Sequence, residues 1–390
     1  MFARSLKTKN TCVFLTFDMT FIVEEEIIMK KIILILFAVI LCVVCLASCN
    51  DANTPEDTTA VTTDGNVSPD STTAGAPTGN ETPGNTDSCV HEYTETVVTP
   101  ALALKDGEKL KKCNKCGNEE TEVIPMTKTL KILALGNSFT VDATRHLWGI
   151  AKDGGVENVV VGNLYIGSCT LDTHWSNISN DLSRYTYYKS TSAAKPTTTE
   201  NYSVERALKD EDWDVFVFHQ ASISASKPET YTHFNEIIDY MLASHPDATV
   251  FYQSSWAYQH DSTHSGFHET YNGDQMYMYN KLLECTQQVA VPNERIEAII
   301  PVGTSAQNLR TTYIGDTITR DGYHLNYGFG RYMAGLAWFA VITGGSIDNV
   351  DFIPEEYPDI AEKLPAIKES VKNALANPFE ITESVEHKTN

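Results

Sequence analysis

From residue 128 onward, short apolar segments alternate with helical patterns, and this alternation constrains the fold more than any other feature of the chain. The strand candidates, rich in Val, Ile and Phe, cover residues 130–135, 158–164, 214–218, 248–253 and 296–302. Helical patterns follow at 142–152, 234–243, 275–289, 328–343 and 360–374. Such alternation predicts an α/β domain over residues 128–378, with a five-stranded parallel sheet covered on both faces. Residues 379–390 form a tail, and residues 180–202 are predicted to be a long loop that could border a site.

The N-terminal region carries a secretory signal. Met29-Lys30-Lys31 precedes an apolar run over 32–44, which ends in Leu46-Ala47-Ser48-Cys49. This ending resembles the lipobox of bacterial lipoproteins, which predicts a signal peptide over 29–48 and a lipid on Cys49. A plain transmembrane anchor fits less well, because the run is shorter than the roughly 20 residues of a spanning helix. Residues 1–28 resemble an upstream extension from a misplaced start codon.

Residues 49–88 are nearly all polar or small and contain no Lys or Arg. A segment of this composition cannot bury enough apolar surface to become ordered, so we predict a lipid-anchored flexible linker. The remaining domains would then lie outside the cytoplasm, in a bacterial cell envelope, tethered to the membrane. The net charge of −22 argues against nucleic acid as a partner.

Three cysteines and one histidine form a cluster at 89–126. Cys89 and His91 precede a Cys-x-x-Cys pair, Cys113 and Cys116. Four sulfur and nitrogen ligands in two close pairs are typical of a structural zinc site, although a disulfide is an alternative in this compartment. The pattern resembles the short zinc-ribbon-like repeats of Firmicutes surface proteins. It predicts a small β-rich module with a structural zinc.

Candidate catalytic residues follow the predicted strands. Ser138 comes directly after the first strand and before a helix, where it is either a nucleophile or simply the residue that caps the helix. Gly167, after the second strand, could present a backbone N–H to a reacting oxygen, or lie in an ordinary tight turn. Gln220, after the third strand, could donate from its amide or bind a loop. Asp321 and His324 have a spacing that lets the carboxylate hold the imidazole tautomer, although a lone Asp-x-x-His is more often a surface feature.

These segments, in this order, resemble the SGNH (GDSL-like) hydrolase superfamily, and specifically a bacterial domain-of-unknown-function branch. The matching segments are residues 132–140, 165–171, 213–222 and 321–325. The resemblance implies a flavodoxin-like, three-layer α/β/α sandwich. It also implies Ser138 as nucleophile, His324 as general base and Asp321 as its orienting partner, with an oxyanion hole built by Ser138 and Gly167. Gln220 stands nearest to the third donor, which is an asparagine in the superfamily, and Asn137 replaces the usual aspartate beside the serine.

The predicted activity is a serine esterase that removes acetyl or other small acyl groups from carbohydrate, with no cofactor for catalysis. Aromatic and polar side chains at strand ends could bind the substrate, although core packing explains the aromatic ones equally well. They are Asn137, Tyr165, His174, Trp175, Trp256 and Tyr258. A non-catalytic glycan-binding lipoprotein and a lipase or lysophospholipase are the alternatives. No long apolar lid is visible in the sequence, which disfavours a lipase.

Overall fold

The computed structural model describes residues 89–388. The predicted extension at 1–28, the signal peptide at 29–48, the lipid site Cys49 and the linker at 49–88 lie outside the described residues. Within residues 89–388, no helix combines the length and the apolar character that crossing a membrane requires.

The described chain begins with a small antiparallel sheet of three strands. They are β1 (Tyr93–Thr99), β2 (Gly107–Cys113) and β3 (Glu119–Ile124), with β2 in the middle. Most of their side chains are exposed, and Lys109 forms ion pairs with Glu95 and Glu122 across the strands. This sheet buries little apolar surface of its own, so a bound metal would add to its stability.

The large sheet has seven strands in the order β10-β9-β8-β4-β5-β6-β7. Five of them are parallel: β4 (Thr129–Gly136), β5 (Asn158–Tyr165), β8 (Val215–Phe218), β9 (Thr249–Gln253) and β10 (Ala298–Ile300). Each coincides with a predicted strand to within a few residues. Taken in chain order, these five strands are arranged 2-1-3-4-5, which is a doubly wound order.

The prediction of five strands was wrong, because residues 180–202 are not a loop. They contain β6 (Tyr185–Ser190) and β7 (Thr197–Tyr202), which extend the sheet antiparallel from β5. Tyr and Thr fit well in strands, but these segments lack the Val, Ile and Phe that marked the others. Tyr185 and Tyr187 pack into the core, whereas most of β7 is exposed. The pairing with β5 therefore depends on contacts that apolar patterning does not reveal.

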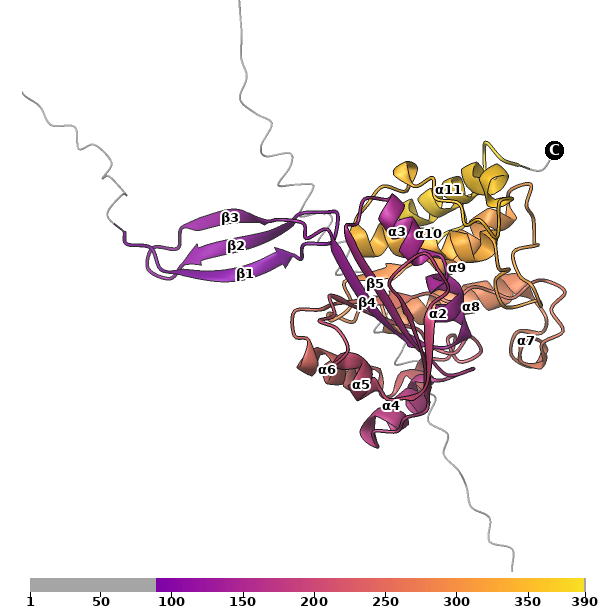
Figure 1. Ribbon diagram of the computed structural model, residues 1–390, viewed down its shortest axis with the longest axis horizontal. Helices are drawn as coiled ribbons and strands as arrows, with labels where there is room; N and C mark the ends of the chain where they lie inside the picture. Colours follow the sequence, from indigo (N-terminus) through magenta and orange to yellow (C-terminus); the bar gives the residue numbers. More distant parts are fainter. Residues whose placement is uncertain (1–88, 389–390) are drawn as a thin grey trace, which may run out of the picture. The chain divides into compact units, whose positions relative to one another are not determined.

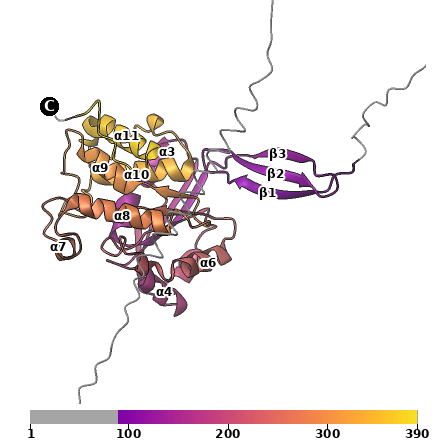
Figure 2. The same cartoon turned by 180° about the vertical axis from the view of Figure 1, so that it is seen from behind.

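Helices cover both faces of the large sheet (Figures 1 and 2). One face packs against α2 (Ser138–Thr144), α3 (Leu147–Asp153), α9 (Val302–Arg310), α10 (Phe329–Thr343) and α11 (Ile360–Ala376). The other packs against α4 (Leu171–Ser179), α5 (Val204–Leu208) and α6 (Phe234–Ser244). The remaining helices are α7 (Ser265–Tyr271) and α8 (Gln275–Val289), with short 3-10 turns at Pro228–Tyr231 and Ile347–Asn349. Along β4, Ile132 and Ala134 join the first core and Leu133 and Leu135 the second, as expected for a strand buried on both sides.

The order in which the parallel strands are added to the sheet reverses at its centre. β4 pairs with β5 on one side and with β8 on the other, so the loops that follow β4 and β5 run to opposite faces. In open α/β sheets, ligands bind at the carboxyl ends of the strands next to such a switch point. Ser138 and Gly167 each lie two residues beyond the last β4–β5 pair, Gly136 with Tyr165, and therefore share this edge.

Candidate active site

Ser138 is the first residue of α2, and it does not cap the helix. The cap is Asn137, whose Oδ1 accepts a hydrogen bond from the Phe139 N–H at 3.1 Å. This leaves the Ser138 hydroxyl available for another partner. Asn137 is 2% exposed, so its prediction as a substrate-binding residue was wrong: its side chain is buried and holds the start of the helix.

Ser138, His324 and Asp321 form one hydrogen-bonded chain. His324 Nε2 lies 2.8 Å from Ser138 Oγ, and His324 Nδ1 lies 2.7 Å from Asp321 Oδ2. Because a carboxylate only accepts, Nδ1 carries the proton and Nε2 is the acceptor for the serine hydroxyl. Burial raises the pKa of Asp321, but hydrogen bonds from the His324 ring and backbone outweigh this effect, so the pKa lies below its ordinary value. Asp321 is therefore ionised where it holds the imidazole.

The loop that carries Asp321 and His324 is fixed by backbone contacts. The Gln259 N–H donates to the Gly322 carbonyl at 2.8 Å, and Trp256 Nε1 donates to the Tyr323 carbonyl at 2.7 Å. Gly322 has a φ of +90°, and a Cβ there would also approach Ser262 to 2.9 Å, so glycine suits this position. These contacts come from the segment after β9, which holds the imidazole in place before a substrate binds.

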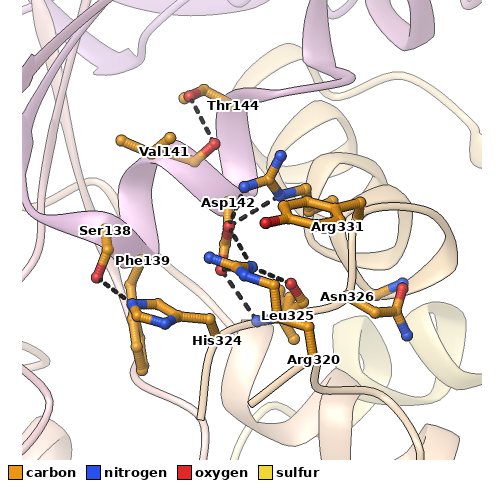
Figure 3. A network of polar contacts seen from close by, with 12 residues as sticks. Ser138, Phe139, Val141, Asp142, Thr144, Arg320, His324, Leu325, Asn326 and Arg331 are labelled. Atoms are coloured by element: carbon orange, nitrogen blue, oxygen red, sulfur yellow. Dashed lines mark hydrogen bonds and ion pairs between the residues drawn. The ribbon is translucent and has the colours of Figure 1, made fainter.

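A second set of contacts joins the loop to the helix of Ser138 (Figure 3). Asp142, one helical turn after Ser138, is fully buried and accepts hydrogen bonds from Arg320, Arg331 and the Leu325 backbone N–H. Burial raises the pKa of Asp142, and the two guanidinium groups oppose this rise. The carboxylate thus ties the residue after His324 directly to α2.

Sequence reasoning missed Asp142. The available signal was a carboxylate four residues after the serine, since Asp142 is the only charged residue of α2. Its partners Arg320 and Arg331 flank His324 in the sequence. Nothing in that spacing shows that both arginines contact Asp142.

Two backbone N–H groups, one at the start of α2 and one in the turn after β5, lack a protein acceptor within residues 89–388. As the first helical residue, Ser138 has no intrahelical acceptor for its N–H, and the cap serves Phe139 instead. Gly167 is exposed in the turn after β5, and its N–H has no protein acceptor within residues 89–388. Asn137 Nδ2 contacts the Cys169 carbonyl at 3.4 Å and joins this turn to the start of α2. The arrangement leaves two unpaired donors, as an oxyanion hole requires.

Gln220 is not a third donor, and that prediction was wrong. Its side chain is fully buried, and Nε2 donates to the carbonyl and the hydroxyl of Thr230 at 2.8 and 3.1 Å. Oε1 accepts from the backbone N–H groups of Leu171 and Ala221, which fixes the orientation of the amide. The amide therefore joins two loops, and its N–H groups are already engaged by Thr230 rather than open to a substrate oxygen.

Three further substrate-binding predictions were also wrong, because His174, Trp256 and Tyr258 are at most 1% exposed. Burial lowers the pKa of His174 to about 3, and its Nδ1 pairs with the Tyr185 hydroxyl. Trp256 stacks on Phe139 at a ring-centre distance of 3.7 Å and supports the Asp321–His324 loop. Tyr165 and Trp175 are partly exposed and remain predicted contacts.

The residues predicted as metal ligands come together. Cys116 Sγ lies 3.3 Å from His91 Nδ1, Cys89 Sγ lies 4.0 Å from Cys113 Sγ, and all four ligand atoms lie within 4.8 Å of one another. Zinc bonds of about 2.0–2.3 Å to such ligands give tetrahedral edges of about 3.3–3.8 Å, which the shorter separations here approach, so the four side chains could hold a metal. Burial raises the pKa of the Cys113 thiol, but hydrogen bonds from the backbone and from His91 lower it by more. The pKa therefore lies at about 5. None of the five described cysteines is in a disulfide.

We expect the purified protein to hold about one zinc ion per chain, since these four side chains can satisfy a structural site. Replacing Cys113 and Cys116 with serine should abolish the bound zinc and speed amide hydrogen exchange in β1–β3. Cys169→Ser is the matched control, because Cys169 is remote from the cluster and should leave the zinc content unchanged. Elemental analysis checks the first result. Metal-free protein with blocked thiols would support the disulfide instead.

Residues 131–369 match the family described as a domain of unknown function, DUF4886. The chain belongs to the DUF4886 family. A crystal structure of a DUF4886 family protein from Bacteroides uniformis ATCC 8492 is 34% identical to it and superposes with a TM-score of 0.62. That match covers 67% of this chain and 100% of the other.

Two other solved structures resemble this DUF4886 protein more distantly. One is a candidate SGNH hydrolase from Slackia heliotrinireducens, 16% identical over 56% of this chain and 100% of that one, with a TM-score of 0.35. The other is a candidate GDSL-like lipase from Parabacteroides merdae ATCC 43184, 13% identical over 56% of this chain and 99% of that one, also at 0.35. No curated protein matches the chain.

Proposed function

We propose that this DUF4886 protein is a serine esterase that removes acetyl or other small acyl groups from carbohydrate. The observation that carries the proposal is the continuous chain from Ser138 through His324 to Asp321, with both contacts shorter than 3 Å. The resemblance of its motifs to the SGNH superfamily supports the same reaction class.

The proposed reaction uses these three hydrogen-bonded side chains in turn. Ser138 Oγ attacks the ester carbonyl while its proton passes to His324 Nε2, and Asp321 stabilises the imidazolium that forms. The N–H groups of Ser138 and Gly167 stabilise the negative charge that develops on the carbonyl oxygen. His324 then gives its proton to the departing alcohol, which leaves an acyl group on Ser138. Water attacks this ester with His324 again as base, and releases the acid and the free serine.

The open character of the site favours a polar substrate over a lipid. The Asp321 side chain is 40% exposed, and the turn that carries Gly167 is exposed as well. Tyr165, partly exposed two residues before Gly167, offers an aromatic face on which a sugar ring could stack. These features support an acylated carbohydrate as the substrate.

We further propose that the enzyme acts in the cell envelope, anchored through a lipid on Cys49. This part rests on the sequence of residues 29–88 alone. Fatty-acid labelling that is lost in Cys49→Ala would support the anchor, and labelling that persists in this variant would exclude Cys49 as its site.

The esterase proposal predicts that the protein hydrolyses p-nitrophenyl acetate and that a fluorophosphonate probe modifies Ser138. An activated serine reacts with such probes because a neighbouring base removes its proton, whereas ordinary serines do not. Peptide mass spectrometry identifies the modified residue. If the protein is inactive on p-nitrophenyl acetate and the probe does not label Ser138, the proposal fails and a glycan-binding role becomes the better explanation.

A further inference from the structure

Three partly exposed side chains form a stripe along α2 and its C-cap, beginning at the candidate nucleophile. They are Ser138, Val141 and Arg145. Steps of three and four residues bring side chains onto one face of a helix, and every residue between them is buried. At 1.5 Å per residue, Arg145 lies about 10 Å along the helix axis from Ser138. The stripe therefore leads away from the reacting serine.

Strands β5 and β6 form a wall opposite this stripe. Val161 and Asn163 point to the face of the sheet that α2 covers, since Asn163 Oδ1 accepts from Thr140 on that helix. Asn163 pairs with Tyr188 and Val161 with Ser190, so these β6 side chains lie on the same face. A cavity of about 260 Å³ lies between these strands and α2. The two strands that the sequence did not predict thus create a groove beside the helix of Ser138.

The charges in this groove differ from those of the rest of the chain. Arg145 and Lys195 are the only charged residues in its lining, although the protein as a whole has a net charge of −22. Lys195 is exposed in the turn between β6 and β7 and has no ion pair with any residue of 89–388. Glu356 pairs with Arg145 from the adjoining cavity, which Arg145 and Lys195 also line. Within the groove itself, the two cations attract an anion locally against the repulsion of the whole protein.

The contact of Arg145 indicates which anion fits. Its Nη2 lies 3.3 Å from Oε2 of Glu356, a side chain that is 55% exposed and lies outside the lining of this cavity. The guanidinium therefore already binds a carboxylate at the edge of the groove, and that carboxylate is free to move into solvent. A carboxylate on a ligand could take its place and reach Lys195 as well.

Polar and aromatic groups lie beside the two cations. The amide of Asn163 is buried at the groove wall, and its Nδ2 has only a long contact of 3.5 Å to Thr144. The rings of Tyr165 and Tyr188 lie 5.9 Å apart, and Tyr188 lines the groove. An amide donor and paired tyrosine rings are groups that bind sugar hydroxyls and sugar faces.

We propose that this groove binds an acidic carbohydrate chain, with a uronic-acid carboxylate held by Arg145 and Lys195, about two helical turns along α2 from Ser138. The inference rests on the proposed esterase function, because Ser138 defines where the ester lies. It names the substrate class: an acylated, carboxylate-bearing glycan.

The test compares acetate release from one acetylated oligogalacturonide with its carboxylates free and with the same carboxylates methyl-esterified. We expect the wild-type protein to have the higher kcat/KM on the free acid. In the double variant Arg145→Gln/Lys195→Gln, the ratio of the two kcat/KM values should fall by about tenfold, as expected when charge-assisted hydrogen bonds to a substrate are lost. Glu356→Gln should shift the ratio in the opposite direction, because it removes the competing carboxylate.

The matched control is Lys281→Gln/Arg295→Gln, which removes the same charge from exposed positions outside the groove and should leave the ratio unchanged. A wild-type protein with no preference for the free acid, or a ratio unaffected by the groove variant, overturns the assignment. In that case p-nitrophenyl acetate hydrolysis that requires Ser138 would still support the esterase. A protein that is inactive on p-nitrophenyl acetate and is not labelled at Ser138 by the fluorophosphonate overturns both.

Discussion

Replacing Ser138 with alanine is expected to lower kcat for p-nitrophenyl acetate by about 10⁴-fold or more, because no other group can form the acyl intermediate. Ser138 is partly exposed, and its hydroxyl contacts only the His324 ring within residues 89–388. The free energy of unfolding should therefore change by less than about 1 kcal/mol. Steady-state kinetics and thermal unfolding measure the two quantities separately.

Ser179→Ala is the matched control for this variant, since Ser179 is an exposed helical serine with two weak local contacts. It should retain full activity. Activity in Ser138→Ala close to that of the wild type would be incompatible with a serine ester intermediate. A large loss of stability would instead assign Ser138 a structural role, and the kinetics of this variant would not test its part in catalysis. Labelling of Ser138 by the fluorophosphonate in the wild-type protein then decides whether it is the nucleophile.

Asp142→Ala is expected to destabilise the protein by about 3–5 kcal/mol, since it leaves two partly buried guanidinium groups without their counter-charge. Arg320 and Arg331 are 21% and 11% exposed, and both contact the Asp142 carboxylate. The Leu325 N–H also loses its acceptor, so the loop of His324 should move away from Ser138. We expect a lower kcat with a smaller change in KM, which indicates a positioning residue rather than one that binds substrate. Chemical denaturation and steady-state kinetics measure these effects.

Asp142→Asn tests the charge separately from the shape, because the amide oxygen can still accept from Leu325. It should be intermediate in both stability and kcat, and it serves if the alanine variant does not fold. Asp359→Ala is the control: this carboxylate is 55% exposed, and its pair with Lys363 on the surface should contribute less than about 1 kcal/mol. An alanine variant at 142 that is as stable and as active as the wild type would disprove the positioning role.

The sequence was informative where local patterns carry the signal. Val, Ile and Phe located the five parallel strands, because a strand buried on both faces is apolar at consecutive positions. The ends of those strands then located Ser138 and Gly167, and the spacing of Cys113 and Cys116 with Cys89 and His91 predicted the cluster that the structure brings together. In each case, residues close together in the sequence were enough to make the prediction.

Burial and long-range partners were decided only by the tertiary structure. Gln220, Trp256 and His174 looked like site residues because they follow strands, but whether a side chain at a strand end faces solvent or another loop depends on distant segments. β6 and β7 lacked an apolar pattern, so the groove beside α2 could not be predicted. Asp142 meets Arg331 across 189 residues of sequence, and Ser138 meets His324 across 186. Sequence order makes the second contact plausible, but only the packing of the loop between α9 and α10 against helix α2 sets its distance.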